Sequence, residues 1–269
     1  MLNLKHQAMQ KLNVLLALRE KLQKRYSQMV GDYTGFFKNK QSAFQGKHGT
    51  YDAQPGYSID TQRVFNERVI TTVDEKFNWW LKEALDYINT TLTIEAANGQ
   101  GAPKAPIIFE GKSYGPFPAT VLLRLKGIVE DSKLNDMFKV VPVRTETVIW
   151  NNSKDADYAA RGIKETELKT YEDKTTESHE EILKDPNINP ENIPSNYRAQ
   201  TTTIKATVKK GEYTTQFFTG EWTHEQRAKL LQRRSALLDA LTIALQEVND
   251  AEAEKCDVTD LFEHLIYGI

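Results

Sequence analysis

The chain has 269 residues, of which 39% are hydrophobic, 10% aromatic and 27% charged, a composition that can build a core and excludes a disordered chain. The 35 basic and 37 acidic side chains leave a net charge of −2, and a lone cysteine excludes an internal disulfide and any multi-cysteine zinc site. No run approaches 18 apolar residues, so we expect no transmembrane helix, and with no apparent secretory signal we expect a cytoplasmic protein that does not engage a membrane.

The first predicted element is a long helix over residues 2–30. Its apolar residues recur at spacings of three and four, which places them on one helical face. They are Leu4, Ala8, Leu12, Leu15, Leu18, Leu22, Tyr26 and Met29. Gly31 is predicted to end the helix, because glycine is the usual residue just after a helix C-terminus.

Residues 31–70 are predicted to be extended and rich in loops, because glycines interrupt every periodic pattern there. An edge strand is expected between Tyr57 and Ile70. Aromatic and lysine side chains alternate through 33–57. They indicate either a loop held against a core or a platform on which nucleic-acid bases stack.

The middle of the chain combines helices with a hairpin. A helix is predicted over 72–97, opened by the capping-box pair Thr72 and Glu75. Residues 107–117 are predicted to form a hairpin around Glu110-Gly111-Lys112-Ser113, followed by a helix over 118–138 that begins at a proline.

The second half begins with alternating residues at 141–150, which predict a half-buried strand. Residues 151–196 form a polar excursion with three prolines near its end. A hairpin is predicted over 198–218, turning at Lys210-Gly211. Thr223 and Gln226 form a second capping-box pattern, which opens a long helix to about residue 250, and a short closing element follows at 257–267.

These elements predict a single α+β domain over 1–269. Its antiparallel sheet is expected to pack against the long N- and C-terminal amphipathic helices, which should also contact each other. Charge is unevenly distributed along this domain. The net charge is +7 for residues 1–50, −5 for residues 151–196 and −6 for residues 246–269. Opposed blocks of this kind can attract each other within a chain or between chains.

Chemical motifs are scarce. The sequence contains no P-loop, no dinucleotide-binding fingerprint and no nucleophile elbow, so we expect no cofactor. The five histidines are widely separated and match no metal-binding spacing, so we expect no metal site. Cys256 lies between acidic residues, which would raise the pKa of its thiol and make it a poor nucleophile. We therefore expect no catalytic residues.

Two groups of residues are candidates for binding. The first is the basic aromatic group Phe36, Phe37, Lys38, Lys40 and Lys47, which could stack bases and neutralise phosphates. The second is the pair Arg233 and Arg234 in the last helix, which could contact phosphate or an acidic surface. Alternatively, these arginines coat the helix or pair with acidic residues of the same chain.

Four segments in order resemble a known family. They are 11–17, 118–123, the run from Phe217-Phe218 to Leu237, and 261–267. In these segments the chain is similar to an uncharacterised family of bacterial and phage proteins, known as a domain of unknown function. The resemblance implies a single domain from end to end, and it assigns no activity and no site residue.

Three hypotheses for function follow. The first is a non-catalytic interaction or assembly protein that self-associates as a homo-oligomer through its long helices and opposed charge blocks. The second is a nucleic-acid- or nucleotide-binding accessory protein that uses the stretch 33–57. The third is a hydrolase whose site is assembled from groups distant in the sequence.

Overall fold

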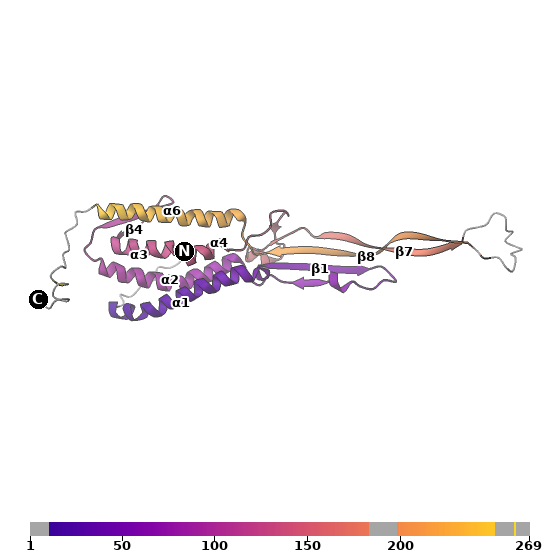
Figure 1. Cartoon of the computed structure of the whole chain (residues 1–269), viewed down its shortest axis with the longest axis horizontal. Helices are drawn as coiled ribbons and strands as arrows, with labels where there is room; N and C mark the ends of the chain where they lie inside the picture. The colour runs from indigo at the N-terminus through magenta and orange to yellow at the C-terminus, as the bar shows by residue number, and fades with distance from the viewer. Residues whose placement is uncertain (1–10, 183–197, 199, 251–260, 262–269) are drawn as a thin grey trace. The chain divides into compact units, whose positions relative to one another are not determined.

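The computed structural model describes residues 11–182, 198, 200–250 and 261. Their contacts divide the chain into two compact units (Figure 1). The helical unit comprises 1–41, 73–144 and 222–269, and the strand unit comprises 42–72 and 145–221. Each unit therefore joins separate segments of the sequence. The prediction of a single domain over 1–269 stays a prediction.

The helices alternate with strands along the chain. The helices of four or more residues are α1 (Leu12–Asn39), η1 (Gln41–Phe44), α2 (Val73–Asn98), α3 (Ala119–Glu130), α4 (Ser132–Lys139), α5 (Ala156–Ala160) and α6 (His224–Asn249). A three-residue 3-10 helix, η2, covers Thr61–Arg63. The strands are β1 (Gln45–Ala53), β2 (Phe65–Glu67), β3 (Lys104–Phe109), β4 (Lys112–Pro118), β5 (Asn151–Asn152), β6 (Lys164–Glu165), β7 (Lys169–Ile182) and β8 (Thr201–Thr219). The α+β fold class is thereby confirmed.

The first helix is longer than its sequence indicates, because α1 passes through Gly31 and Gly35 and ends at Asn39. Two glycines in a helix interior cost about 1 kcal/mol each relative to alanine. Beyond them, Phe37 is fully buried and its ring lies 5.7 Å from that of Phe77 on α2. Burial of this aromatic side chain offsets the glycine cost, and the prediction that the helix stops at Gly31 is wrong.

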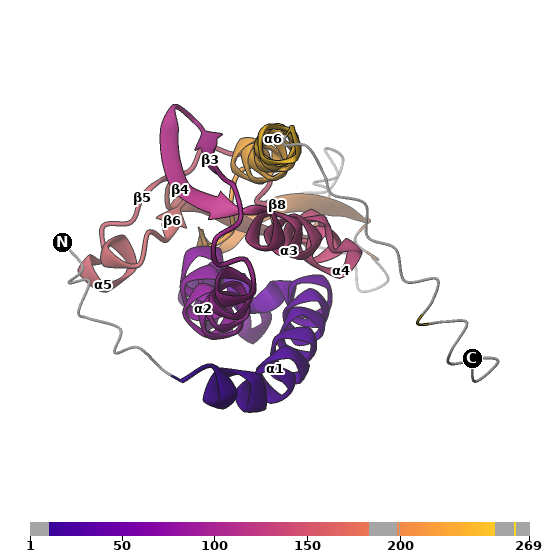
Figure 2. The ribbon, with the colours of Figure 1, turned by 90° about the vertical axis from the view of Figure 1, so that its left-hand side faces the viewer.

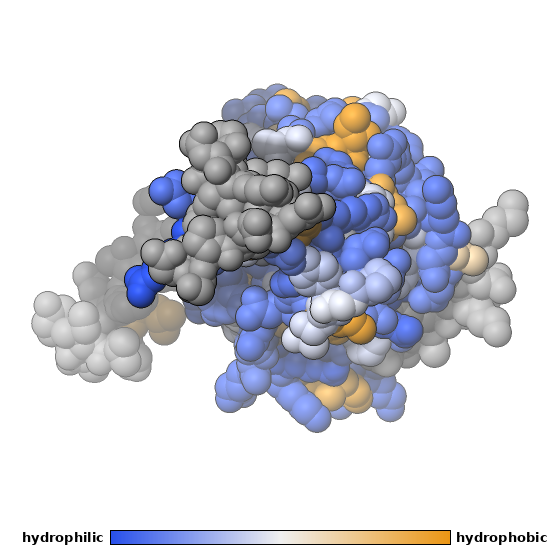
Figure 3. All heavy atoms as spheres, turned by 90° about the vertical axis from the view of Figure 1, so that its right-hand side faces the viewer, coloured by the Kyte–Doolittle hydropathy of each residue, from blue (hydrophilic) through white to orange (hydrophobic). Residues whose placement is uncertain are grey.

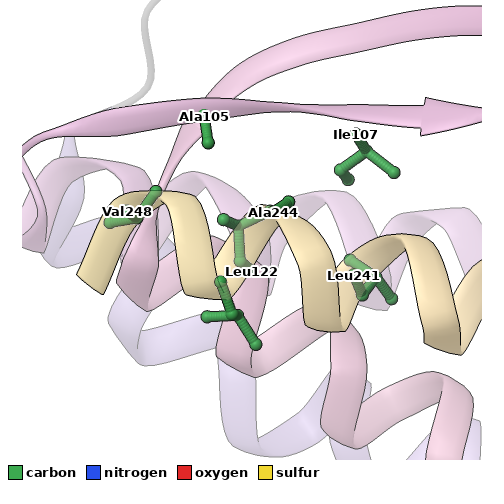
Figure 4. Close-up of a cluster of buried hydrophobic side chains, with 7 residues drawn as sticks. Ala105, Ile107, Leu122, Leu241, Ala244 and Val248 are labelled. Atoms are coloured by element: carbon green, nitrogen blue, oxygen red, sulfur yellow. The ribbon is translucent and has the colours of Figure 1, made fainter. Parts of the chain in front are cut away.

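A hydrophobic cluster joins α6, α3 and the β3–β4 hairpin of the helical unit (Figure 4). Leu241 and Ala244 of α6 meet Leu122 of α3, with Ala105 and Ile107 of β3 covering them. The predicted hairpin is confirmed, and its turn contains Glu110 and Gly111, both with positive φ. The long C-terminal helix is also confirmed, including the reciprocal capping box of Thr223 and Gln226.

The long first and last helices do not pack mainly on each other. α1 packs on α2 and α4, whereas α6 packs on α3, α4 and β3. Figure 2 shows α2 and α3 between α1 and α6. The predicted helix over 118–138 is two helices, because Asp131 interrupts it and its carboxylate accepts the amide of Lys133 at 2.8 Å as the cap of α4.

The strand unit contains an antiparallel sheet with the order β2-β1-β8-β6-β5, and β7 also pairs with β8. The predicted edge strand within 57–70 is confirmed as β2. The predicted hairpin turn at Lys210-Gly211 is wrong, because β8 continues through both residues. Gly211 serves close packing: a Cβ there would lie 2.6 Å from the carbonyl oxygen of Asp52 on β1.

The predicted strand over 141–150 is also wrong. Val143 forms only an isolated bridge with Trp222, and Pro142 has no amide to donate to a ladder. Other hydrogen bonds engage this segment: the amide of Arg144 donates to the carbonyl oxygen of Trp222 at 2.9 Å, and the indole of Trp150 donates to that of Thr145 at 2.7 Å. The polar excursion, by contrast, supplies β5, β6 and β7 to the sheet, and it also contains α5. The predicted element at 257–267 lies outside the described residues, apart from Leu261 in a helical position.

Candidate interaction surface

The most distinctive feature of the strand unit is the pairing of β7 with β8. The two strands lie side by side from Lys169 opposite Thr215 to Ile182 opposite Thr201 (Figure 1). β1 pairs with β8 only as far as Gly211. We call residues 174–182 and 201–209 the distal ribbon. In the described part of the chain it is a sheet of two strands, and none of its side chains is buried.

Both edges of the distal ribbon lack a neighbouring strand among the described residues. Exposed edges present rows of backbone donors and acceptors that can pair with another chain. The two edges differ in charge. Residues 174–182 of β7 carry one basic and three acidic side chains, whereas residues 201–209 of β8 carry two basic and none acidic. The ribbon is therefore acidic along one edge and basic along the other.

A polar network fixes the base of the ribbon, where β8 has an extra residue, Lys210, opposite the step from Asp173 to Lys174 of β7. The carboxylate of Asp173 accepts the hydroxyl of Tyr51 at 2.9 Å and pairs with the guanidinium of Arg63 at 3.3 Å. Arg63 also lies 4.0 Å above the ring of Tyr213, which stacks on Tyr171. Burial, followed by the hydrogen bond to Asp173, raises the pKa of the Tyr51 hydroxyl. Tyr51 therefore stays a neutral donor, and the network holds three neighbouring strands together.

A second charged group lies at the same level of the ribbon. Glu172 accepts a charged hydrogen bond from Lys174 at 2.8 Å, and Lys209 lies between Glu172 and Glu212. The bond from Lys174 lowers the pKa of Glu172, and the hydrogen bond to Glu212 raises the pKa of Lys209. Both shifts favour the charged forms of Glu172 and Lys209, so the two ion pairs are maintained at this level of the ribbon.

Beside this base lies a surface pocket of about 340 Å³. Its apolar walls are Val148, Ile149, Tyr171 and Phe217, and Lys169, Glu167 and three threonines supply polar groups. Ile149 is 79% exposed and Phe217 is 47% exposed. Elsewhere the surface seen in Figure 3 is mostly hydrophilic, with hydrophobic side chains in scattered patches. The pocket can accept an apolar side chain of a partner, with an ammonium and a carboxylate nearby.

The structure distributes the predicted basic aromatic residues over two units. Phe36, Phe37, Lys38 and Lys40 lie at the end of α1 in the helical unit, and Lys47 lies on β1 in the strand unit. Phe37 belongs to the core, so it offers no face for stacking.

Neighbouring side chains engage several of these residues. The ammonium of Lys76 lies 4.2 Å above the ring of Phe36. Lys47 pairs with Glu67 at 3.1 Å and lies over the ring of Phe65. Lys38 and Lys40 are exposed.

The two predicted arginines have different structural roles. Arg234 donates from Nε to the carbonyl oxygen of Val129 at 2.8 Å and from Nη2 to that of Glu130 at 3.1 Å. It therefore caps the C-terminus of α3, where a cation is favoured by the helix dipole. Arg233 pairs with Glu110 of the β3–β4 turn at 3.0 Å, and both side chains are more than half exposed.

The described residues offer little for catalysis. His48 lines a polar pocket of about 380 Å³ with Asp155 and Asp157. The carboxylate of Asp155 is engaged as the N-cap of α5, where it accepts two backbone amides. No group of three His, Cys, Asp or Glu side chains that could hold a metal ion occurs in the described part of the chain. His6, His264 and Cys256 lie outside it.

Sequence reasoning missed the distal ribbon itself. The segment 169–182 has a low apolar content and no regular alternation, so the sequence predicts a polar excursion there and not a strand. A strand with both faces in water has no apolar period, so hydrophobic patterning does not reveal it. Within the described helices, none is long and apolar enough to cross a membrane.

Comparison with known proteins gives one positive result. Searches of the curated proteins and of the solved structures find no match to this chain. A family model matches residues 9–267, which span segments of both units. The chain therefore belongs to DUF7873, a family of unknown function.

Proposed function

We propose that the chain is a non-catalytic assembly protein that self-associates through the edges of its distal ribbon. The observation that supports this proposal is a ribbon of nine paired positions with no buried side chain and two edges that no described strand covers. An isolated two-stranded ribbon is at best marginally stable in water. Pairing with further strands would satisfy its open backbone groups and add cross-strand contacts.

The charges of the two edges favour one mode of pairing. Two β7 edges would bring acidic side chains together, and two β8 edges would oppose lysines, both of which are unfavourable. The acidic β7 edge of one copy and the basic β8 edge of the next attract each other. Such a contact is head-to-tail, so it generates a ring if the rotation closes and an open filament if it does not. The proposal therefore places the interface of the predicted homo-oligomer at the ribbon edges instead of at the long helices.

Paired charge reversals test this interface. K205E/T207E makes the β8 edge acidic, and E180K/E181K makes the β7 edge basic; all four residues are exposed. Neither variant should assemble alone, because its two edges repel. A 1:1 mixture should assemble, because each edge then finds an opposite one. The control K133E reverses an exposed charge on α4 and should assemble like the original chain.

The measurement is native mass spectrometry and sedimentation at low salt, where exposed charges act over a longer distance. Multiples of the 30.7 kDa chain that disappear in each variant and return in the mixture would support the proposal. A monomeric original chain at micromolar concentration, or variants that assemble unchanged, would refute it. Circular dichroism of each variant checks that the fold is retained.

The nucleic-acid alternative depends on Lys38 and Lys40, the exposed lysines of the predicted group. The burial of Phe37 and the pairing of Lys47 with Glu67 leave less of the proposed stacking platform than the sequence indicates. A cytoplasmic location and a bacterial or phage origin belong to this proposal as well, the first because one cysteine suits a reducing compartment.

A further inference from the structure

The N-terminal half of α1 exposes more apolar surface than its packing explains. Leu15 is buried, but Leu12, Val14, Leu16 and Leu18 are 39–49% exposed. At 100° per residue, these four positions flank Leu15 on both sides, so the apolar face is about half of the helix circumference. Among the described elements α1 packs mainly on α2 and α4, and contact with two helices needs a narrower apolar stripe. The additional exposed apolar surface indicates that a further element packs against this half of α1.

This face is surrounded by positive charge. Residues 11–25 carry five basic side chains and one acidic side chain, a net charge of +4. Arg19 and Arg25 pair with Glu95 and Glu83 of α2, at 4.0 and 2.9 Å. A second copy of α1 would bring the same positive charge to the face and be repelled. An acidic, amphipathic occupant would be attracted.

The sequence after α6 has these properties. Residues 251–269 carry five acidic side chains and one basic, a net charge of −4. Their large apolar residues include Val258, Leu261, Phe262, Leu265 and Ile266, spaced at i, i+3, i+4, i+7 and i+8 as on one face of a helix. Leu261 is 65% exposed. The sequence after α6 thus offers an apolar stripe of opposite charge to the apolar face of α1, and among the described residues both Leu261 and that face are exposed.

Contacts within the helical unit place the end of α6 and the N-terminal half of α1 at the same end of the helix bundle. Val248 of α6 belongs to the cluster that contains Leu122, near the start of α3. Thr120 of α3 donates to the carbonyl oxygen of Glu95 at 2.7 Å, near the end of α2. Glu95 in turn pairs with Arg19 of α1. Residues 250–257 can span about 25 Å when extended, roughly the width of three packed helices.

We infer that residues 257–267 dock on the N-terminal half of α1 in the same copy, with their apolar side chains over Leu12, Leu16 and their neighbours. The docking is helix-in-groove recognition, in which an amphipathic segment lays its apolar side on an apolar face. It connects the basic beginning of the chain to its acidic end. It is independent of the proposed ribbon pairing, which involves the strand unit alone.

The single cysteine of the chain provides a direct probe. Cys256 immediately precedes the segment, so the full-length chain is labelled there with a photoactivatable benzophenone and irradiated. Cross-links should map to peptides of α1 between residues 12 and 22. Mixing ¹⁵N-labelled with unlabelled chains distinguishes cross-links within one copy from cross-links between two copies. Links within one copy never join a labelled to an unlabelled peptide, and this result supports the inference. Links that join the two isotopes at the frequency of random pairing, or links only to other elements, overturn it.

A second measurement removes the docking without touching α1. In L261D/L265D the segment loses its apolar side, and hydrogen exchange of amides 15–22 should become roughly tenfold faster because an apolar cover is lost. The control L261M/L265M keeps the apolar surface and should exchange like the original chain. Equal exchange rates in all three proteins would overturn the inference, since the segment would then cover nothing on α1.

Discussion

Arg233 and Arg234 provide a matched pair that tests whether a predicted binding residue is structural. Both are arginines on one turn of α6, yet only Arg234 reaches the last carbonyl groups of α3, at 2.8 and 3.1 Å. We expect R234A to lower the free energy of unfolding of the helical unit by about 1.5 kcal/mol. Two charge-assisted bonds to partly exposed carbonyls contribute about 1 kcal/mol, and the favourable cation at the helix terminus adds roughly 0.5 kcal/mol.

R233A should cost at most about 0.5 kcal/mol, because it removes an exposed ion pair with Glu110. The assay is urea unfolding followed by helical circular dichroism. With a slope of about 2 kcal/mol per molar urea, R234A should shift the midpoint by roughly 0.7 M and R233A by less than about 0.25 M. Equal midpoints for the two variants would refute the capping role. R234K should recover only part of the loss, because an ammonium cannot span both carbonyls as a guanidinium does.

Two further predictions concern α1. Burial, with a contribution from nearby Asp131, raises the pKa of Tyr26 from its ordinary value of 10.0 to about 12. The unfolded chain therefore loses the Tyr26 proton at lower pH than the folded chain does, and the free energy of unfolding should fall as pH rises from 10 towards 12. Y26F should weaken that alkaline loss in a thermal-unfolding series, and an unchanged pH profile would contradict the assignment to Tyr26. K38E/K40E should abolish any binding of a fluorescent single-stranded oligonucleotide seen at 50 mM salt, with K133E as the control of equal sign; binding that survives K38E/K40E would exclude these lysines as the nucleic-acid contact.

Local patterns in the sequence predicted the long helices α2 and α6, the core of α1, the β3–β4 hairpin and the cap of α6. Each depends on interactions within a few residues: apolar spacing at three and four, a two-residue turn with Gly111, and the reciprocal bonds of Thr223 and Gln226. The sequence also located the opposed charge blocks and the resemblance to a family of unknown function, which the match over residues 9–267 confirms.

Tertiary contacts decided the remaining features. α1 continues through Gly31 because Phe37 finds a partner on α2 that local propensity does not register. β8 continues through Gly211 because strands from distant parts of the sequence, β1 and β7, pair on its two sides, and β1 leaves no room there for a Cβ. Phe37 and Arg234 became structural residues for the same reason, since burial and hydrogen bonding depend on neighbours far away along the chain. The distal ribbon is determined by backbone pairing in water, which leaves no hydrophobic period in the sequence.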